Sequence, residues 1–138
     1  MSALYETDCK RGKTLRVRKN AQNIFGEGVA LLRDRIYQLS WRNRTGFIYN
    51  RSFQPLREFH YDMEGWGLTQ DGKQLIWSDG SAKLYWLDAQ PQKITRDILV
   101  HDGAQAVVRL NELEYVNGLI DANTRLSGRL RATCAATR

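Results

Sequence analysis

The 138-residue sequence has few of the residues that build covalent or metal cross-links. It contains two cysteines, Cys9 and Cys134, and two histidines, His60 and His101, and all four lie far apart in the sequence. Two cysteines are too few for a disulfide framework, and they lack the spacing of a metal-binding cluster. We therefore expect no metal site, no cofactor and no cysteine–histidine nucleophile. A disulfide between the two ends of the chain stays open.

Long apolar runs and helical patterns are also missing. No segment approaches the roughly 18 consecutive apolar residues of a membrane-spanning helix. The first six residues show no basic region followed by an apolar stretch, so we expect no signal peptide and leave the localisation open. No stretch keeps the period of 3.6 residues that is typical of an amphipathic helix.

Acidic residues are fewer than basic ones: the sequence has 15 acidic and 21 basic residues, which gives a net charge of +6. A net positive charge is slight support for acidic partners or nucleic acid. The basic residues are dense only at 10–19 and 125–138, and no zinc-finger spacing or RNA-binding aromatic signature accompanies them. We interpret the charge as solvated surface and expect neither nucleic acid nor membrane as a partner, although binding of nucleic acid by the basic termini stays open as a third function.

The chain does have enough apolar residues for a core, 42% of the total with four Trp, six Tyr and four Phe, so disorder is excluded. These residues fall in short segments separated by turn signals, of which Asp71-Gly72 and Asp79-Gly80 are the clearest. The pattern predicts an all-β chain of antiparallel meanders. The expected strands are 14–18, 28–32, 35–41, 45–49, 66–69, 74–78, 83–88, 94–100, 106–110 and 112–120, with 55–61 as a polar link.

A repeat accompanies these strands. Glu27-Gly28, Glu64-Gly65 and Glu112-Leu113 are 37 and 48 positions apart, each at the expected start of a strand. Repeats of about 40–50 residues built from three or four antiparallel strands are typical of β-propeller blades. The inner strands of such blades converge, so Glu27, Glu64 and Asn111 are expected to point at one site. A sandwich of hairpins, in which these positions scatter, stays open.

Several motifs together resemble the glutamine cyclotransferases, the plant and bacterial type of glutaminyl-peptide cyclotransferase, from about Leu4 to Asn123. The motifs are Phe25–Gly28, Leu39–Trp41, Glu64–Thr69, Asp71–Lys73, Ser78–Ser81 and Leu110–Tyr115. The resemblance implies a five-bladed β-propeller that converts the N-terminal glutamine of peptides or proteins to pyroglutamate with release of ammonia. It also implies that no metal is essential.

The resemblance assigns the chemistry to two residues. A carboxylate beside an aromatic side chain and close to apolar residues can have its pKa raised toward neutral pH and can transfer protons. By resemblance this residue is Glu27, and the side-chain amide of Asn111 stabilises the oxyanion. We interpret Glu64 and Glu112 as hydrogen-bonding groups rather than catalysts.

The resemblance also implies an aromatic pocket that folds the glutamine side chain back onto its own amine. Phe25, Trp41 and Trp66 match the pocket aromatics of the family, with core packing as the alternative for each of them. Trp77 and Trp86 are assigned to the core of the blades.

The chain also departs from the family pattern. The Phe-Thr-Gln-Gly motif near the family's N-terminus is absent, Arg125 stands where the family has a pocket tryptophan, and a pocket lysine of a later blade falls beyond residue 138. At about 45 residues per blade, residues 1–138 predict one incomplete propeller of about three blades. Residues 124–138 are expected to form an irregular or disordered tail. The sequence thus predicts a truncated member.

Two functions compete. The first is cyclotransferase activity by Glu27 and Asn111 on N-terminal glutamine. The second is an inactive propeller fragment that serves as a binding or interaction module, which the missing pocket elements favour for this chain as it stands. Open propeller edges also predict self-association.

Overall fold

The computed structural model describes residues 2–89, 93–125 and 130–135. Over these residues the chain forms strands and turns without helices, so the all-β expectation is confirmed, and none of the described segments is a helix able to span a membrane. The strands are β1 (Ala3–Asp8), β2 (Lys13–Lys19), β3 (Gly26–Leu32), β4 (Arg35–Ser40), β5 (Thr45–Asn50), β6 (Pro55–His60), β7 (Leu68–Gln70), β8 (Leu75–Ser78), β9 (Lys83–Leu87), β10 (Ile94–Leu99), β11 (His101–Asp102), β12 (Gln105–Ala106), β13 (Leu110–Val116), β14 (Leu119–Thr124) and β15 (Leu130–Ala135).

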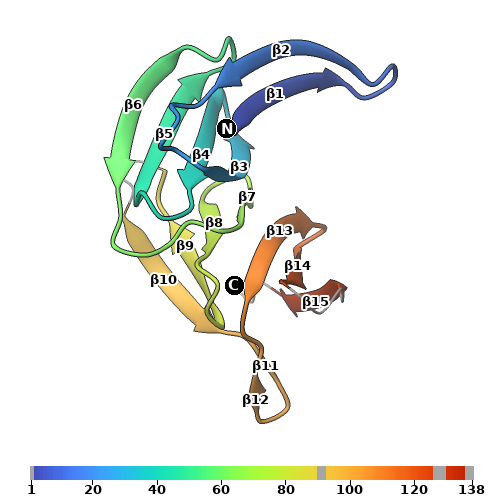
Figure 1. Cartoon of the computed structure of the whole chain (residues 1–138). Helices are drawn as coiled ribbons and strands as arrows, with labels where there is room; N and C mark the ends of the chain where they lie inside the picture. Colours follow the sequence, from blue (N-terminus) through green and yellow to red (C-terminus); the bar gives the residue numbers. More distant parts are fainter. Residues whose placement is uncertain (1, 90–92, 126–129, 136–138) are drawn as a thin grey trace.

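The larger sheets are antiparallel meanders that follow one another along the chain. Two have four strands, in the orders β3-β4-β5-β6 and β7-β8-β9-β10, and one has three, β13-β14-β15. Figure 1 shows them arranged around an arc, with β3, β7 and β13 on the inside and β6 and β10 on the outside. This is the blade arrangement of a partial β-propeller, as the sequence predicted. The alternative, a sandwich of hairpins, does not match this arrangement of the sheets.

The outer strands were the hardest to place from the sequence. Residues 55–61 were expected to be a link, but Pro55–His60 forms β6, the outer strand of the first blade. Residues 94–100 were expected to form a strand, and Ile94–Leu99 forms β10, which pairs with β9 as the outer strand of the second blade. Both strands are mostly exposed. They therefore lack the alternation of apolar and polar residues that marks a half-buried strand.

The third blade also differs from expectation. The single strand predicted at 112–120 is a hairpin of β13 and β14, because Asn117 and Gly118 have φ angles of 51° and 83° and form its turn. An Asn-Gly pair is a strong hairpin signal, and it was overlooked. The strand predicted at 106–110 is absent: Gln105–Ala106 belongs to the short β11–β12 hairpin, and Leu110 begins β13.

The blades are held together by two apolar clusters that lie on opposite faces of β8. Leu75 and Trp77 pack in the cluster shared with the first blade, whereas Ile76 packs in the cluster shared with the third. Successive side chains of a strand point to opposite faces, so a strand covered on both sides is apolar throughout. Trp77 and Trp86 are each about 1% exposed, which confirms their assignment to the core.

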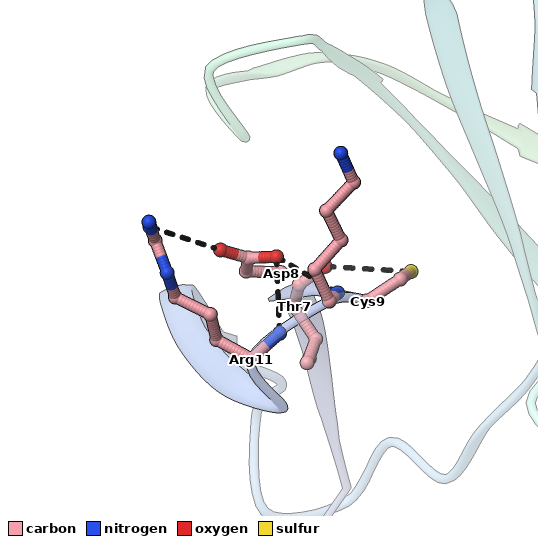
Figure 2. Close-up of polar contacts among 5 residues, drawn as sticks. Thr7, Asp8, Cys9 and Arg11 are labelled. Atoms are coloured by element: carbon pink, nitrogen blue, oxygen red, sulfur yellow. Dashed lines mark hydrogen bonds and ion pairs between the residues drawn. The ribbon is translucent and has the colours of Figure 1, made fainter.

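A separate hairpin, β1–β2, precedes the first blade. Leu4 is buried against Ile36, Tyr49 and Phe53 of that blade. Figure 2 shows the hairpin's turn, where an oxygen of Asp8 accepts the backbone N–H groups of Lys10 (2.9 Å) and Arg11 (3.3 Å). Cys9, in this turn, is exposed and free.

The segment expected to be an irregular tail, residues 124–138, is described only in part. Thr124 ends β14, and Leu130–Ala135 forms β15, which pairs antiparallel with β14. Here the structure has a strand where irregular chain was expected. The reason is that β14 offers unpaired backbone groups at its edge, and backbone pairing does not depend on the side-chain alternation used for the prediction. Residues 126–129 and 136–138 lie outside the described residues.

Candidate active site

A pocket of about 250 Å³ lies where the inner parts of the three blades meet. Its walls are formed by Phe25, Glu27, Trp41, Trp66, Asn111 and Arg125. All five residues singled out from the sequence as catalytic or substrate-binding therefore line one space, although they come from segments up to 86 positions apart (25 to 111). Arg125 is the sixth.

The acid and the amide occupy matching positions in two blades. In the first blade Gly26 pairs with Ser40 and the register then shifts, which leaves Glu27 at a β-bulge. In the third blade Leu110 pairs with Thr124 and the register shifts in the same way, which leaves Asn111 at the bulge. Bulges redirect side chains and are common beside active sites. The repeat read from the sequence aligned Glu27 with Glu112, but the structural repeat aligns it with Asn111.

Asn111 is held against the second blade by its backbone. The buried hydroxyl of Ser78 donates to the carbonyl oxygen of Asn111 at 2.7 Å and accepts the N–H of Gly67 at 2.9 Å. Gly67 lies so close to this carbonyl that a Cβ atom there would overlap it. A residue without a side chain is therefore required at position 67. The packing fixes where the second and third blades meet at the pocket.

Glu27 is half-buried, and its surroundings favour the protonated acid. Burial raises the pKa of Glu27 above its ordinary value, the negative charge of Glu112 raises this pKa further, and the positive charge of Arg125 opposes the rise. Glu112 has a raised pKa itself, from burial and from neighbouring Glu114. A carboxyl group with a raised pKa is better matched to both accept and return a proton near neutral pH.

Glu64 orients the two tryptophans of the pocket. One of its carboxylate oxygens accepts the indole N–H of Trp41 at 2.9 Å and that of Trp66 at 2.8 Å. The interpretation of Glu64 as a hydrogen-bonding group is thus confirmed, although it lies in the loop before β7 rather than at a strand start. No sequence pattern indicated that its partners would be the two indoles, since Trp41 is 23 positions away.

Backbone contacts place the aromatic side chains. The N–H of Trp41 donates to the carbonyl of Phe25 at 2.9 Å, and that of Gly65 donates to the carbonyl of Trp41 at 3.1 Å. The rings of Phe25 and Trp41 meet edge to face, with centroids 6.1 Å apart. Phe25 is 54% exposed, so it is a pocket rim rather than a core residue.

Trp66 has a firmer support. Its backbone N–H donates to the carbonyl of Ser78 at 3.1 Å, and its carbonyl accepts the N–H of Gly28 at 2.8 Å. Gly80, with a φ of +82°, passes directly under the indole, where a side chain would collide with the ring. Trp41 and Trp66 thus become fixed walls of the pocket.

Arg125 faces both walls. Its guanidinium carbon lies 5.6 Å from the ring centroid of Trp41 and 5.5 Å from that of Trp66, within the range of cation–π attraction. The sequence put Arg125 where the family pattern has a pocket tryptophan, and Arg125 lines the pocket; its stacking near both indoles was not predicted. Among the described residues, no group of three or more His, Cys, Asp or Glu side chains is placed to hold a metal ion.

The fold and the pocket place this chain among the β-propeller proteins, with a small site between the blades that is lined by a carboxyl group, an amide and two oriented indoles. Comparison with known sequences gives the family. A family profile described as glutamine cyclotransferase matches residues 1–132, and the chain belongs to that family. A curated relative, the glutaminyl-peptide cyclotransferase of Arabidopsis thaliana, is 40% identical over 124 residues.

Solved structures agree. The crystal structure of Myxococcus xanthus glutaminyl cyclase superposes with a TM-score of 0.86 at 30% identity, over 94% of this chain and 56% of that one. The WD40 domain of Neurospora crassa Pan2 matches with a TM-score of 0.67 at 11% identity, over 95% of this chain and 41% of that one, which shows the propeller fold alone. The chain covers 39% of the length of the Arabidopsis relative, and 88% of the chain takes part in that match.

Proposed function

We propose that this chain carries the proton-transfer group and the oxyanion donor of a glutaminyl-peptide cyclotransferase, with Glu27 and Asn111 in these roles. The observation that supports the proposal is the pocket itself: Glu27, Asn111, Trp41 and Trp66 line a space of about 250 Å³, which suits a single glutamine side chain. The substrate is a peptide or protein with an N-terminal glutamine, which becomes pyroglutamate.

In the first step the substrate's neutral α-amine attacks the carbon of its own γ-carboxamide, and a new N–C bond forms. The Glu27 carboxylate takes a proton from the attacking nitrogen. Negative charge develops on the γ-oxygen, where the side-chain N–H groups of Asn111 stabilise it.

In the second step the bond between the γ-carbon and the amide nitrogen breaks. Glu27 returns its proton to that nitrogen, which leaves as ammonia, and the carbonyl is restored in the five-membered ring. One carboxyl group serves both steps, so the raised pKa of Glu27 is useful in both directions. The products are a pyroglutamyl peptide and ammonia, and Glu27 ends as the carboxylate it was at the start.

Trp41, Trp66 and Phe25 supply shape. The reaction needs a bent glutamine side chain with the amine and the γ-carbon in contact, and an extended side chain is unreactive. The two indoles, fixed by Glu64, leave a cavity that a folded side chain fills. Such positioning replaces a search among conformations and raises the effective concentration of the amine.

The test is turnover of a glutamine-initiated peptide, followed by ammonia release and by mass spectrometry of the peptide. Glu27→Gln is expected to lower the rate by at least about a hundredfold, and Asn111→Ala by about a hundred- to a thousandfold. Glu58→Gln, on outer strand β6 and remote from the pocket, is the matched control and should leave the rate unchanged. Equal rates in the chain and in Glu27→Gln would contradict the assignment.

A second function is favoured by one observation: Arg125 lines the pocket at the position where the family pattern has a tryptophan. Under this alternative the pocket binds glutamine-initiated peptides without converting them. Peptide binding that depends on Trp41 and Trp66, with no ammonia released over prolonged incubation, would support the binding module over the enzyme.

A further inference from the structure

Arg125 is built into the pocket by a chain of backbone contacts. Its N–H donates to the carbonyl of Arg109 at 3.0 Å, and the N–H of Arg109 donates to the carbonyl of Gly80 at 2.9 Å. Gly80 in turn lies under the indole of Trp66. The backbone of Arg125 is thus tied to the same loop that supports Trp66, so its place beside the pocket is set by the fold.

The same arrangement occurs in the first blade, where the N–H of Trp41 donates to the carbonyl of Phe25. Trp41 follows β4 and Arg125 follows β14, so the two residues hold equivalent positions after the second strand of their blades. The first blade therefore places an apolar wall at this position, whereas the third blade places a cation.

The guanidinium of Arg125 stacks near both indoles and acts on Glu27 electrostatically, but it makes no salt bridge in the part of the chain that the structure describes. The four salt bridges found among the described residues involve other side chains. A guanidinium carries five N–H donors in a planar fork that fits a carboxylate. Its contacts with Trp41 and Trp66, at 5.6 and 5.5 Å, leave these donors unpaired among the described residues.

The pocket walls therefore include both a carboxyl group, from Glu27, and a cation, from Arg125. The negative charge of Glu112 raises the pKa of Glu27, and the positive charge of Arg125 lowers it. A ligand with an amine and a carboxylate would place the amine at Glu27 and the carboxylate at Arg125. Because the pocket measures about 250 Å³, the two groups must be close in the ligand.

We propose that Arg125 forms a carboxylate-binding subsite, so that the preferred substrates carry a carboxylate on the reacting glutamine or on the residue that follows it. This inference rests on the proposed function of the pocket. The carboxylate has two possible sources: a free α-carboxylate, in glutamine itself or a Gln dipeptide, and the side chain of an acidic second residue.

The experiment measures binding through the indole ¹H–¹⁵N signals of Trp41 and Trp66, assigned with Trp→Phe variants. Two proteins are compared, the Glu27→Gln variant and the double variant Glu27→Gln/Arg125→Gln. Both lack Glu27, so that no ligand is consumed. The ligands are free glutamine, Gln-Ala, Gln-Ala amide, Gln-Glu amide and Gln-Lys amide, together with acetyl-alanine as a carboxylate without N-terminal glutamine.

The carboxylate ligands are expected to bind about ten- to a hundredfold more tightly than Gln-Ala amide, the gain of a charge-assisted contact. Arg125→Gln should remove this preference and Arg125→Lys should keep part of it. Gln-Ala against Gln-Glu amide tells the two sources apart. The matched control is Arg42→Gln, which removes another cation over Trp41 (4.0 Å) that does not line the pocket, and it should preserve the preference.

Each result has one meaning. If neither Gln-Ala nor Gln-Glu amide binds more tightly than Gln-Ala amide, the subsite is overturned and the proposed function stays intact. Arg125-dependent binding of acetyl-alanine without binding of any glutamine ligand would support the subsite and contradict the proposed function. No binding of any ligand would overturn the subsite.

Discussion

At the residue scale, two glutamates of the same candidate site are suited to different tasks because of what surrounds them. Glu27 lines the pocket beside Glu112 and has a raised pKa, so it is suited to proton transfer. One oxygen of Glu64 receives two indole N–H groups, so this residue is suited to orientation. The sequence showed both as a glutamate followed by glycine, and only their neighbours in space separate them.

The pKa of Glu27 can be tested without turnover. Replacing Glu112 by glutamine removes a negative charge that favours the protonated form, so the pKa of Glu27 is expected to fall toward the ordinary glutamate value of about 4.3. The measurement is a ¹³C titration of the Glu27 carboxyl in both proteins. If the chain cyclises peptides, the acidic limb of its pH–rate profile should move to lower pH in the same variant. A pKa of Glu27 that rises in Glu112→Gln would contradict this account.

The role of Glu64 leads to a second prediction. Glu64→Ala removes the shared acceptor of two indoles, which we expect to lower the free energy of unfolding by about 1.5–3 kcal/mol and to shift the indole N–H signals of Trp41 and Trp66 together. Glu64→Gln keeps a neutral acceptor and should lose less. The buried Trp86, whose indole N–H makes no hydrogen bond to Glu64, provides an internal reference signal, whereas the indole N–H of Trp77 donates to the backbone carbonyl of Glu64 at 3.2 Å and is not used as one. Movement of only one pocket signal would argue against joint orientation.

At the element scale, the inner strands β3, β7 and β13 lie side by side (Figure 1), and small residues allow the approach. β7 follows the loop that carries Gly67, which presses on the carbonyl of Asn111. The pocket therefore depends on how closely neighbouring blades pack, and only secondarily on the loops at its mouth.

Gly67→Ala tests this dependence. The added methyl group must displace the Asn111 backbone, so we expect a loss of about 2–3 kcal/mol in the free energy of unfolding, measured with urea. Gly103→Ala is the control: nothing lies within 4 Å of its Cβ position, and its φ of +58° makes it cost only the left-handed conformation, about 1–2 kcal/mol. A smaller loss at Gly67 than at Gly103 would contradict the packing argument.

The sequence predicted the buried strands well, whereas it missed the exposed outer strand β6 and gave β10 as a strand of the wrong blade. β3, β4, β5 and β8 are buried on at least one face, so their composition identifies them. β6 and β10 are exposed and were placed through backbone pairing alone, which composition does not record.

For the candidate site, the sequence singled out five of the residues that line the pocket, but it did not predict two of the contacts around them. Motifs singled out Glu27, Asn111 and the three aromatics, and the structure gathers them in one pocket. The shared bond to Glu64 and the stacking of Arg125 depend on distances across blades, which a sequence does not contain.

At the scale of the whole molecule, apolar surface remains open along the first blade. Tyr5 on β1 and Val29 and Leu31 on β3 are 60%, 44% and 43% exposed, beside a groove of about 260 Å³. An apolar groove beside a strand is suited to contact with another protein surface. For this chain in isolation we expect the contacting surface to belong to a second copy of the chain.

The corresponding prediction is concentration-dependent self-association, measured by analytical ultracentrifugation. Leu31→Lys should weaken it by placing a charge in the contact. Leu99→Lys changes a leucine on outer strand β10 that is even more exposed (56%), and it should leave association unchanged. A chain that stays monomeric at every concentration would remove the basis for this prediction.

The matching bulges of Glu27 and Asn111 have a consequence for redesign. Glu27 and Asn111 occupy equivalent positions in the first and third blades, on either side of the second. Their mutual alignment therefore follows from the rotation between successive blades. Connections at the rims can then be lengthened, swapped or grafted from relatives without disturbing that alignment, whereas inserting or deleting a blade between the two stations would separate acid from amide.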